Sequence, residues 1–464
     1  MTLIWHLRRR NSYRRSKLPP GPRGWPVIGN IFDFGTLPHR GLAALKQKYG
    51  PVVWLNLGPV KTMVILSAAA AEELFKNHDL SFADRFTNDT MSSRRISETA
   101  LIRQKCVDEM LLWIEKEVEK GASGGIELTK FIFPASFNLI GNLTVSRDLM
   151  NPYSEMASEF QTALSGFSEC LGSPNISDLF PWLRWLDLQG LRATTDQNLG
   201  KAMQIISGFL DDRVKQRQQK EARAAEHKDF LDVLLDFEGS GKNEPAKLSR
   251  HQITIFLMEM FMAGTDTTSA TIEWAMCELL QNPEPMKKIK AELVRVVGVN
   301  NRLLESDIDN LPYLQATIEE TLRLHAPVPL VLPRKATKDT DFMGYKVPKD
   351  TQVFVNAWAI GRDEENWEDA LCFKPERFLG SSIGYKGQNY EFLPFGAGRR
   401  ICPGIPLSHH MLPLILGSLL HHFDWKLSEN VRSEMKIDMR EKMGLAAKKL
   451  EPLRAVPTHM TTSS

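Results

Sequence analysis

The sequence lacks the long apolar runs that mark membrane-spanning and secreted chains. Two apolar stretches, residues 1–7 and 253–263, fall short of the roughly 18–20 residues that cross a bilayer. The second stretch also contains Glu259. We therefore expect no complete transmembrane helix and no secretory signal in this sequence.

Cysteine is also scarce. The chain has 5 cysteines among 464 residues, an odd number, scattered and without a CxxC pair. This usage is typical of a reducing compartment and excludes a disulfide framework. A single cysteine is usually a buried apolar residue. We make that assignment for four of the five, Cys106, Cys170, Cys277 and Cys372.

Net charge is low as well, at +2, which argues against a nucleic-acid partner. The charge is unevenly distributed, because the first acid is Asp33 and residues 1–32 are strongly basic. The cations before Asp33 are Arg8, Arg9, Arg10, Arg14, Arg15, Lys17 and Arg23. A basic leader on a slightly acidic body favours contact with an anionic membrane surface. An inert solvated tail and a fragment of a targeting segment are the alternatives.

What is present is an ordinary globular composition, 42% hydrophobic and 25% charged, without repeats or low-complexity tracts. The pattern predicts strands at 52–57 and 62–66 and a helix at 68–78. It predicts a long helix at 249–281 and another near 405–421. A helical majority with a small strand-rich portion predicts an α+β fold.

One loop carries most of the chemical information. Residues 395–404 read FGAGRRICPG and present Cys402 just before a predicted helix. Glycines allow close approach of the backbone, and Arg399, Arg400 and a helix N-terminus stabilise negative charge. From the residues alone, Cys402 could be a redox thiol, a nucleophile or a metal ligand.

The loop resembles the haem-thiolate loop of the cytochromes P-450, whose pattern is FxxGxRxCxG. The matching positions are Phe395, Gly398, Arg400, Cys402 and Gly404. The resemblance implies a mostly helical fold with haem b (heme b) between the long central helix and the helix after the cysteine loop. It implies that Cys402 is the axial ligand of the iron, a ligation that favours O–O cleavage. It also implies that Arg400 and Arg334 pair with the haem propionates.

Two further motifs match the family in order. Glu320 and Arg323 match ExxR, and the resemblance implies a buried triad completed by Arg377 that supports the structure and does no chemistry. Residues 263–268, AGTDTT, lie in the long helix, where hydroxyls bend helices. A structural kink is therefore one interpretation. The resemblance instead implies a catalytic pair, with Thr267 steering protons to bound dioxygen and Asp266 in the relay.

The chain departs from the family between Arg85 and Arg94. The family has a lid helix and a helix with the haem-contacting motif WxxxR in this region, and here the nearby Trp113 is followed four residues later by Glu117. We therefore predict an internal deletion near residues 86–94. The predicted domains are a residual basic leader, residues 1–18, and one catalytic domain, residues 19–464.

The resemblance is to a plant microsomal member, closest to the group that oxidises terpenoids. It implies hydroxylation of a small apolar substrate with dioxygen and electrons from NADPH through an NADPH-cytochrome reductase. It places the protein on the cytosolic face of the endoplasmic reticulum, or in the cytosol if the anchor is incomplete. Positions that would face substrate, or else pack in the core, are Met258, Ala263, Val328, Leu330 and Leu445. The alternatives are an inactive, haem-deficient product and a haem-thiolate isomerase or dehydratase.

Overall fold

The structure is a computed structural model that describes most of the chain. The described residues are 18–82, 99–121, 124–173, 175–219, 229–239, 245–427 and 437–459. Residues 1–17 of the predicted leader and the predicted deletion near 86–94 lie outside the described residues.

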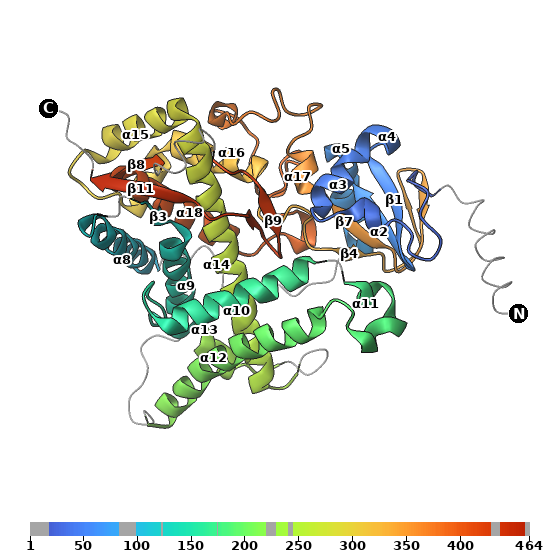
Figure 1. The fold of residues 1–464 in the computed structure, drawn as a ribbon, viewed down its shortest axis with the longest axis horizontal. Helices are drawn as coiled ribbons and strands as arrows, with labels where there is room; N and C mark the ends of the chain where they lie inside the picture. Colours follow the sequence, from blue (N-terminus) through green and yellow to red (C-terminus); the bar gives the residue numbers. More distant parts are fainter. Residues whose placement is uncertain are drawn as a thin grey trace, which may run out of the picture.

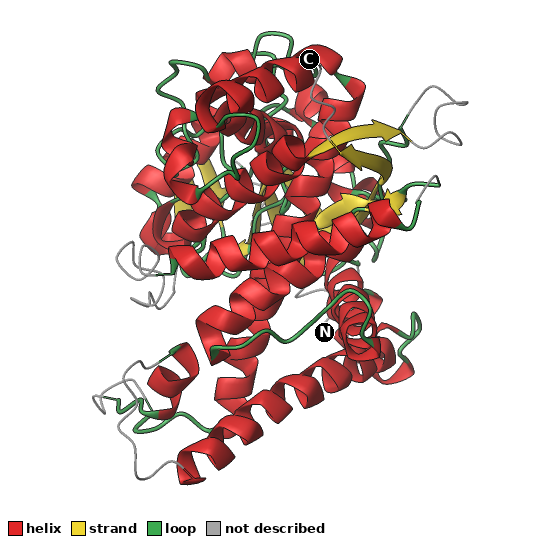
Figure 2. Ribbon diagram, turned by 90° about the vertical axis from the view of Figure 1, so that its left-hand side faces the viewer, coloured by secondary structure: helices red, strands yellow, loops and turns green. Residues whose placement is uncertain are grey.

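A helix of 32 residues, α14 (Arg250–Gln281), runs through the middle of the molecule (Figure 1). It packs against α9 (Thr129–Val145), α12 (Leu191–Gln219), α16 (Pro312–Leu324) and α18 (Ile405–His422). The predicted long helix and mostly helical α+β fold are therefore confirmed (Figure 2). None of the helices in the described ranges is long and apolar enough to span a membrane.

The ends of α14 follow from local chemistry. The Ser249 side chain accepts a hydrogen bond from the Gln252 backbone, and the Gln252 side chain accepts one from the Ser249 backbone, which forms a capping box. The helix ends at Gln281, and its C-cap residue Asn282 directly precedes the proline that starts the next helix. The hydroxyl of Thr267 donates to the Ala263 carbonyl at 2.7 Å without interrupting the helix.

The other helices surround this axis. The longer ones are α8 (Ala100–Glu119), α10 (Glu155–Gly172) and α15 (Pro283–Val297). The shorter α-helices are α2 (Ile31–Phe34), α3 (Pro38–Ala44), α4 (Lys46–Tyr49), α5 (Ala68–Glu72), α6 (Asp79–Phe82), α11 (Ile176–Leu179), α13 (Phe230–Leu235) and α17 (Ala357–Ile360). The π and 3-10 helices are η1 (Glu73–Asn77), η3 (Pro181–Leu186), η4 (Glu305–Asn310), η5 (Pro375–Phe378) and η6 (Gly398–Arg400).

The largest sheet joins the start of the chain to its second half. Its strand order is β1 (Val52–Leu57), β2 (Val60–Ile65), β7 (Gln352–Val355) and β4 (Arg334–Lys335). The β1–β2 pair is antiparallel, and β2 runs parallel to β7 because the chain returns to the sheet much later. Strand β4 pairs with β7 at the edge and places Arg334 there.

The described residues also form three smaller sheets. One contains β3 (Ile126–Glu127), β11 (Arg454–His459) and β8 (Phe423–Leu427). The other two are hairpins, β5 (Thr340–Phe342) with β6 (Tyr345–Val347), and β9 (Glu441–Met443) with β10 (Ala447–Lys449). The β10 strand contacts α14, so this hairpin reaches the central helix.

Two local predictions are corrected near the first sheet. Strand β2 begins at Val60, not at residue 62, because Val60 closes the tight turn opposite Leu57. The helix predicted over 68–78 is α5 followed by a π-helical segment from Glu73. The Glu73 carboxylate accepts hydrogen bonds from Asn77 and from His78, which fits the wider final turn.

Candidate functional site

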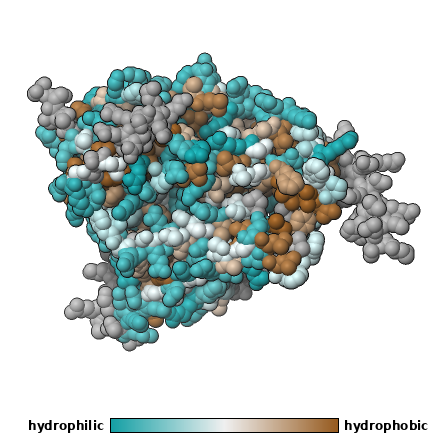
Figure 3. Space-filling view, in the orientation of Figure 1, coloured by the Kyte–Doolittle hydropathy of each residue, from teal (hydrophilic) through white to brown (hydrophobic). Residues whose placement is uncertain are grey.

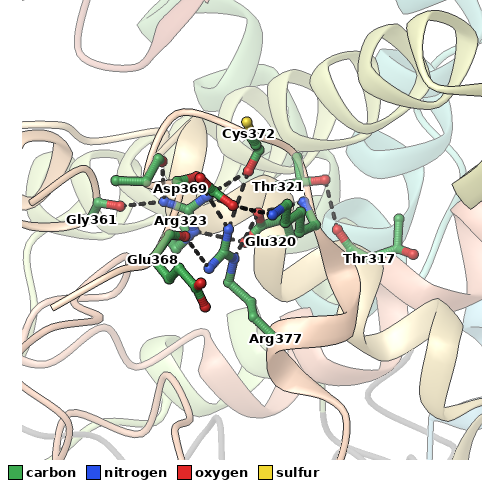
Figure 4. Close-up of polar contacts among 11 residues, drawn as sticks. Thr317, Glu320, Thr321, Arg323, Gly361, Glu368, Asp369, Cys372 and Arg377 are labelled. Carbon is green, nitrogen blue, oxygen red and sulfur yellow. Dashed lines mark hydrogen bonds and ion pairs between the residues drawn. The ribbon is translucent and has the colours of Figure 1, made fainter. Parts of the chain in front are cut away.

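Glu320 lies at the centre of a buried cluster on α16 (Figure 4). Both of its oxygens accept hydrogen bonds from Arg323, at 2.7 and 2.8 Å, and both side chains are completely buried. The guanidinium of Arg377, from η5, donates to the same carboxylate at 3.0 Å. The structure therefore brings together the three residues that the resemblance expects in a triad.

The two arginines of this cluster also bind backbone carbonyls. Arg323 donates to Gly361 at 2.6 Å and to Ala370 at 2.7 Å, and Arg377 donates to Glu368 at 2.9 Å (Figure 4). These carbonyls belong to the irregular segment that runs from α17 to η5. The charged cluster thus fastens a long stretch without regular structure to α16.

The cysteine loop folds as a tight turn before α18. The backbone N–H of Cys402 donates to the Phe395 carbonyl at 3.0 Å, which closes the loop. Gly396 and Gly398 have φ angles of 70° and 67°, a region that favours glycine. Cys402 is half-buried and precedes the first turn of α18, where the helix dipole stabilises a thiolate.

Arg334 and Arg400 both contact this loop region. Arg334 is buried and donates to the Ala397 carbonyl at 3.0 Å, and Arg400 donates to the Pro333 carbonyl at 3.3 Å. Burial lowers the pKa of Arg334, while its hydrogen bond to Asp79 acts in the opposite direction. Its Nε is buried and has no hydrogen-bond partner among the described residues.

Asp79, at the start of α6, is a member of this cluster that sequence reasoning missed. Its carboxylate accepts a hydrogen bond from Arg334 Nη1 at 2.9 Å and from the Arg399 backbone N–H at 2.9 Å. The three residues come from separate parts of the chain, so no sequence spacing could have revealed the contact.

The AGTDTT segment places different side chains in different surroundings. Ala263 is exposed and Thr267 half-buried, although α14 crosses the middle of the molecule. Asp266 is buried, and its Oδ2 lies 2.8 Å from Nζ of Lys448 on β10. Sequence reasoning missed Lys448 because the two residues are far apart in the chain.

The candidate substrate positions divide into two groups. Met258 and Leu330 are buried in apolar clusters, so in this structure they pack in the core. Ala263, Val328 and Leu445 retain exposed surface.

Trp113 does not provide the WxxxR contact in this chain. It lies on α8 and is half-buried, and Glu117 is one turn further along the same helix. The Glu117 carboxylate accepts hydrogen bonds from Tyr153 at 2.9 Å and from Lys120 at 2.8 Å. This position therefore carries a negative charge that is already paired.

A cavity of about 280 Å³ lies between α16 and α18, beside Phe395. Glu319 lines it together with Tyr385 and His409, which are hydrogen-bonded to each other. Burial raises the pKa of Glu319 to about 7. A cavity of about 600 Å³ between α10, α12 and the loop after α9 is lined by none of the predicted site residues.

The side chains of the cysteine loop, of Arg334 and of the exposed part of α14 fit a haem group. A half-buried thiol at a helix N-terminus is suited to bind iron. The buried Arg334, with one guanidinium nitrogen unpaired, is suited to a carboxylate such as a propionate. The exposed Ala263 and half-buried Thr267 show that part of α14 is not covered by protein atoms.

Comparison with known proteins decides the family. The sequence model of the family described as "Cytochrome P450" matches residues 19–100 and residues 83–453. The chain belongs to the cytochrome P450 family. The predicted resemblance is thereby confirmed, and the chain is a cytochrome P450 monooxygenase, an oxidoreductase whose family implies a haem iron.

Several plant cytochromes P450 are similar over almost their whole length. Cytochrome P450 76A2 of Solanum melongena is 50% identical, with 95% of this chain and 93% of the relative covered. An iridoid oxidase of Catharanthus roseus is 44% identical, with 98% and 95% covered. A geraniol 8-hydroxylase of the same plant is 40% identical, with 96% and 95% covered.

These alignments contain positions without a counterpart in this chain. The alignment with cytochrome P450 76A2 has 473 positions but covers 95% of 464 residues, about 441, which leaves about 30 positions unmatched. The alignment with the geraniol 8-hydroxylase has 478 positions and covers 96%, about 445, with a similar remainder. The family match is itself divided into two stretches, and these overlap over residues 83–100.

We predict that Glu320→Gln destabilises the protein by about 3–5 kcal/mol, because it leaves the buried guanidinium of Arg323 and the partly buried one of Arg377 without a counter-charge. Differential scanning calorimetry at pH 6 measures the effect. The matched control is Glu319→Gln, next in sequence. Glu319 holds its proton at that pH, so we expect little change. Equal losses of stability in the two variants would contradict the prediction.

We also predict that Glu273 and Glu319 contribute stability that is fully present below about pH 4.5 and is lost as pH rises to about 7. Burial raises the pKa values of Glu273 and Glu319 to about 7, so the folded protein binds more protons than the unfolded chain in this window. Each group contributes at most about 3 kcal/mol. Thermal unfolding across this range measures the slope, and the double variant Glu273→Gln with Glu319→Gln should flatten it. An unchanged slope in that variant would refute the assignment.

Proposed function

We propose that this chain is a haem-thiolate monooxygenase that hydroxylates a small apolar molecule, a terpenoid, with electrons from an NADPH-cytochrome reductase. The observation that carries the proposal is the cysteine loop, with Cys402 half-buried at the start of α18 and Arg334 and Arg400 beside the loop. Bound haem would supply activation of dioxygen for insertion of one oxygen atom into the substrate.

The residues around the loop have separate tasks in this proposal. Cys402 would ligate the iron, while Gly398 and Gly404 keep the backbone compact around the sulfur. Arg334 and Arg400 would pair with the propionates, since guanidinium groups bind carboxylates strongly. Glu320, with its two arginines, holds the segment between α17 and η5 and takes no part in the reaction.

On α14, Thr267 and Asp266 handle protons. The Thr267 hydroxyl donates to the Ala263 carbonyl. The lone pairs of its oxygen therefore remain available to accept a hydrogen bond from a proton donor at this half-buried position. Asp266 is a buried acid one residue earlier in the helix. An acid and a hydroxyl at consecutive positions of this helix suit proton delivery to the dioxygen that bound haem would activate, and the pair speaks against an isomerase or dehydratase.

The names of two similar proteins support the substrate class. An iridoid oxidase and a geraniol 8-hydroxylase act on terpenoids, and both align with almost all of this chain. Ala263, Val328 and Leu445 would contact the substrate, because they are small or apolar and keep exposed surface.

Apolar surface supports contact with the face of the endoplasmic reticulum membrane. Trp182 and Trp185 on η3, and Trp25 and Phe32 near α2, are each at least 66% exposed. Figure 1 places α2 and α11, which precedes η3, at the end of the molecule where the described chain begins, and Figure 3 shows apolar patches there. Exposed aromatic side chains suit the membrane interface, and the basic leader would add attraction to anionic lipids.

A second candidate function is that of an inactive product that retains haem poorly. The divided family match and the unmatched alignment positions support a deletion of about 30 residues near residues 86–94 within the catalytic domain, residues 19–464. Such a deletion removes a lid and a propionate contact. Haem with fewer charge-assisted contacts binds less tightly.

The haem-thiolate assignment is tested by a carbon monoxide difference spectrum of the reduced protein. We expect the red-shifted Soret band of thiolate ligation, and its loss in Cys402→Ser. The control is Cys372→Ser, which should keep the band, because the structure exposes Cys372 and so corrects the buried position predicted for it. A Soret band at the position of other ligands in the unchanged protein would refute thiolate ligation. Turnover without NADPH would favour the alternative function of a haem-thiolate isomerase or dehydratase.

The deletion is tested by haem titration of the purified protein. Inserting the corresponding segment of cytochrome P450 76A2 between Arg85 and Arg94 should tighten haem binding by about tenfold or more, since one charge-assisted contact is worth about 1.5–3 kcal/mol. A matched insertion of the same length in a Gly/Ser sequence controls for chain length. Tight, stoichiometric haem uptake by the unchanged protein would contradict the inactive-product hypothesis.

A further inference from the structure

The buried carboxylate of Asp266 is contacted by a residue of the β9–β10 hairpin. Its side chain is 3% exposed, and its Oδ2 lies 2.8 Å from Nζ of Lys448. Neither oxygen has a hydrogen-bond partner among the described residues, so the contact with Lys448 is an ion pair without hydrogen-bond alignment. A buried charge that depends on one counter-charge is sensitive to the loss of that counter-charge.

The hairpin that presents Lys448 is anchored on two sides. The backbone N–H of Leu445, at its tip, donates to the carbonyl of Ser168 on α10 at 2.9 Å. The N–H of Ala447 donates to the Pro327 carbonyl at 2.8 Å. These bonds determine the position of β10 relative to α14, so the lysine ammonium is held against Asp266 by backbone contacts.

The neighbouring lysine serves a different purpose. Lys449 is buried, its Nζ lies over the Trp274 ring at 5.2 Å, and it donates to the Asp438 carbonyl. Successive side chains of a strand point to opposite faces. Lys449 therefore packs into the core, while Lys448 reaches Asp266 from the other face of β10.

We propose that Lys448 is a positioning residue that holds the Asp266 carboxylate in place for proton delivery, and so links the substrate-side hairpin to the proton-handling pair on α14. The proposal rests on the proposed function of Asp266. Leu445, at the tip of the same hairpin, is a candidate substrate contact. A substrate that contacts Leu445 would thus touch the same β9–β10 hairpin that orients the Asp266 carboxylate.

Loss of Lys448 would change how the electrons of NADPH are divided between hydroxylated product and hydrogen peroxide. In coupled turnover, NADPH, a proton, dioxygen and substrate yield NADP+, hydroxylated product and water. When proton delivery is misdirected, NADPH, a proton and dioxygen yield NADP+ and hydrogen peroxide, and the substrate is unchanged. Without Lys448 the carboxylate has no counter-charge within the hairpin and loses its orientation, so the peroxide fraction rises.

The experiment compares Lys448→Met and Lys448→Arg with Lys442→Met as the matched control. Lys442 lies on β9 of the same hairpin, but it pairs with the exposed Glu169 on α10. Hydrogen peroxide formed per NADPH consumed is measured in the reconstituted protein with reductase, with geraniol as the probe. We expect about a threefold rise in Lys448→Met, restoration by Lys448→Arg and no change in the control.

A second readout does not depend on turnover. In a double-mutant cycle on thermal unfolding, Lys448→Met should lower the midpoint by about 2 °C, and by less than half of that when Asp266 is already Asn. Additive shifts, or an unchanged peroxide fraction in Lys448→Met, would overturn the proposal. Coupling in the cycle without a thiolate Soret band in the unchanged protein would refute the proposed function and leave the pair a purely structural one.

Discussion

The structure depends most on one buried carboxylate, that of Glu320. It is completely buried, and it accepts hydrogen bonds from Arg323, from Arg377 and from the Lys374 backbone. The two arginines also donate hydrogen bonds to backbone carbonyls between α17 and η5. Because an uncompensated charge here is so costly, the cluster holds the irregular segment between α17 and η5 firmly on α16.

The central helix, α14, packs against α16 and α18. It carries an exposed Ala263 and a half-buried Thr267 on either side of the buried Thr265 and Asp266, and it places Asp266 against a hairpin from the end of the chain. Buried charged groups thus hold two parts of the molecule in place, the segment between α17 and η5 on α16 and the β9–β10 hairpin on α14.

Much of this arrangement was predictable. The long helix, the strand at Val52–Leu57 and the family motifs are local patterns, and local patterns survive folding because hydrogen bonding and capping are satisfied within a few residues. The missing WxxxR arginine was also evident from the sequence. The π-helical segment after α5 was not, because the side-chain hydrogen bonds of Glu73 that accompany it leave no periodic signature.

The sequence by itself determined the fold class, the identity of the thiolate candidate and the presence of the ExxR pair, since each is encoded in consecutive or helically spaced residues. Only the tertiary structure decided that Asp79 joins Arg334 and that Lys448 pairs with Asp266. The physical reason is separation along the chain. A contact between residues far apart in sequence depends on how elements pack, and packing is a property of the whole chain.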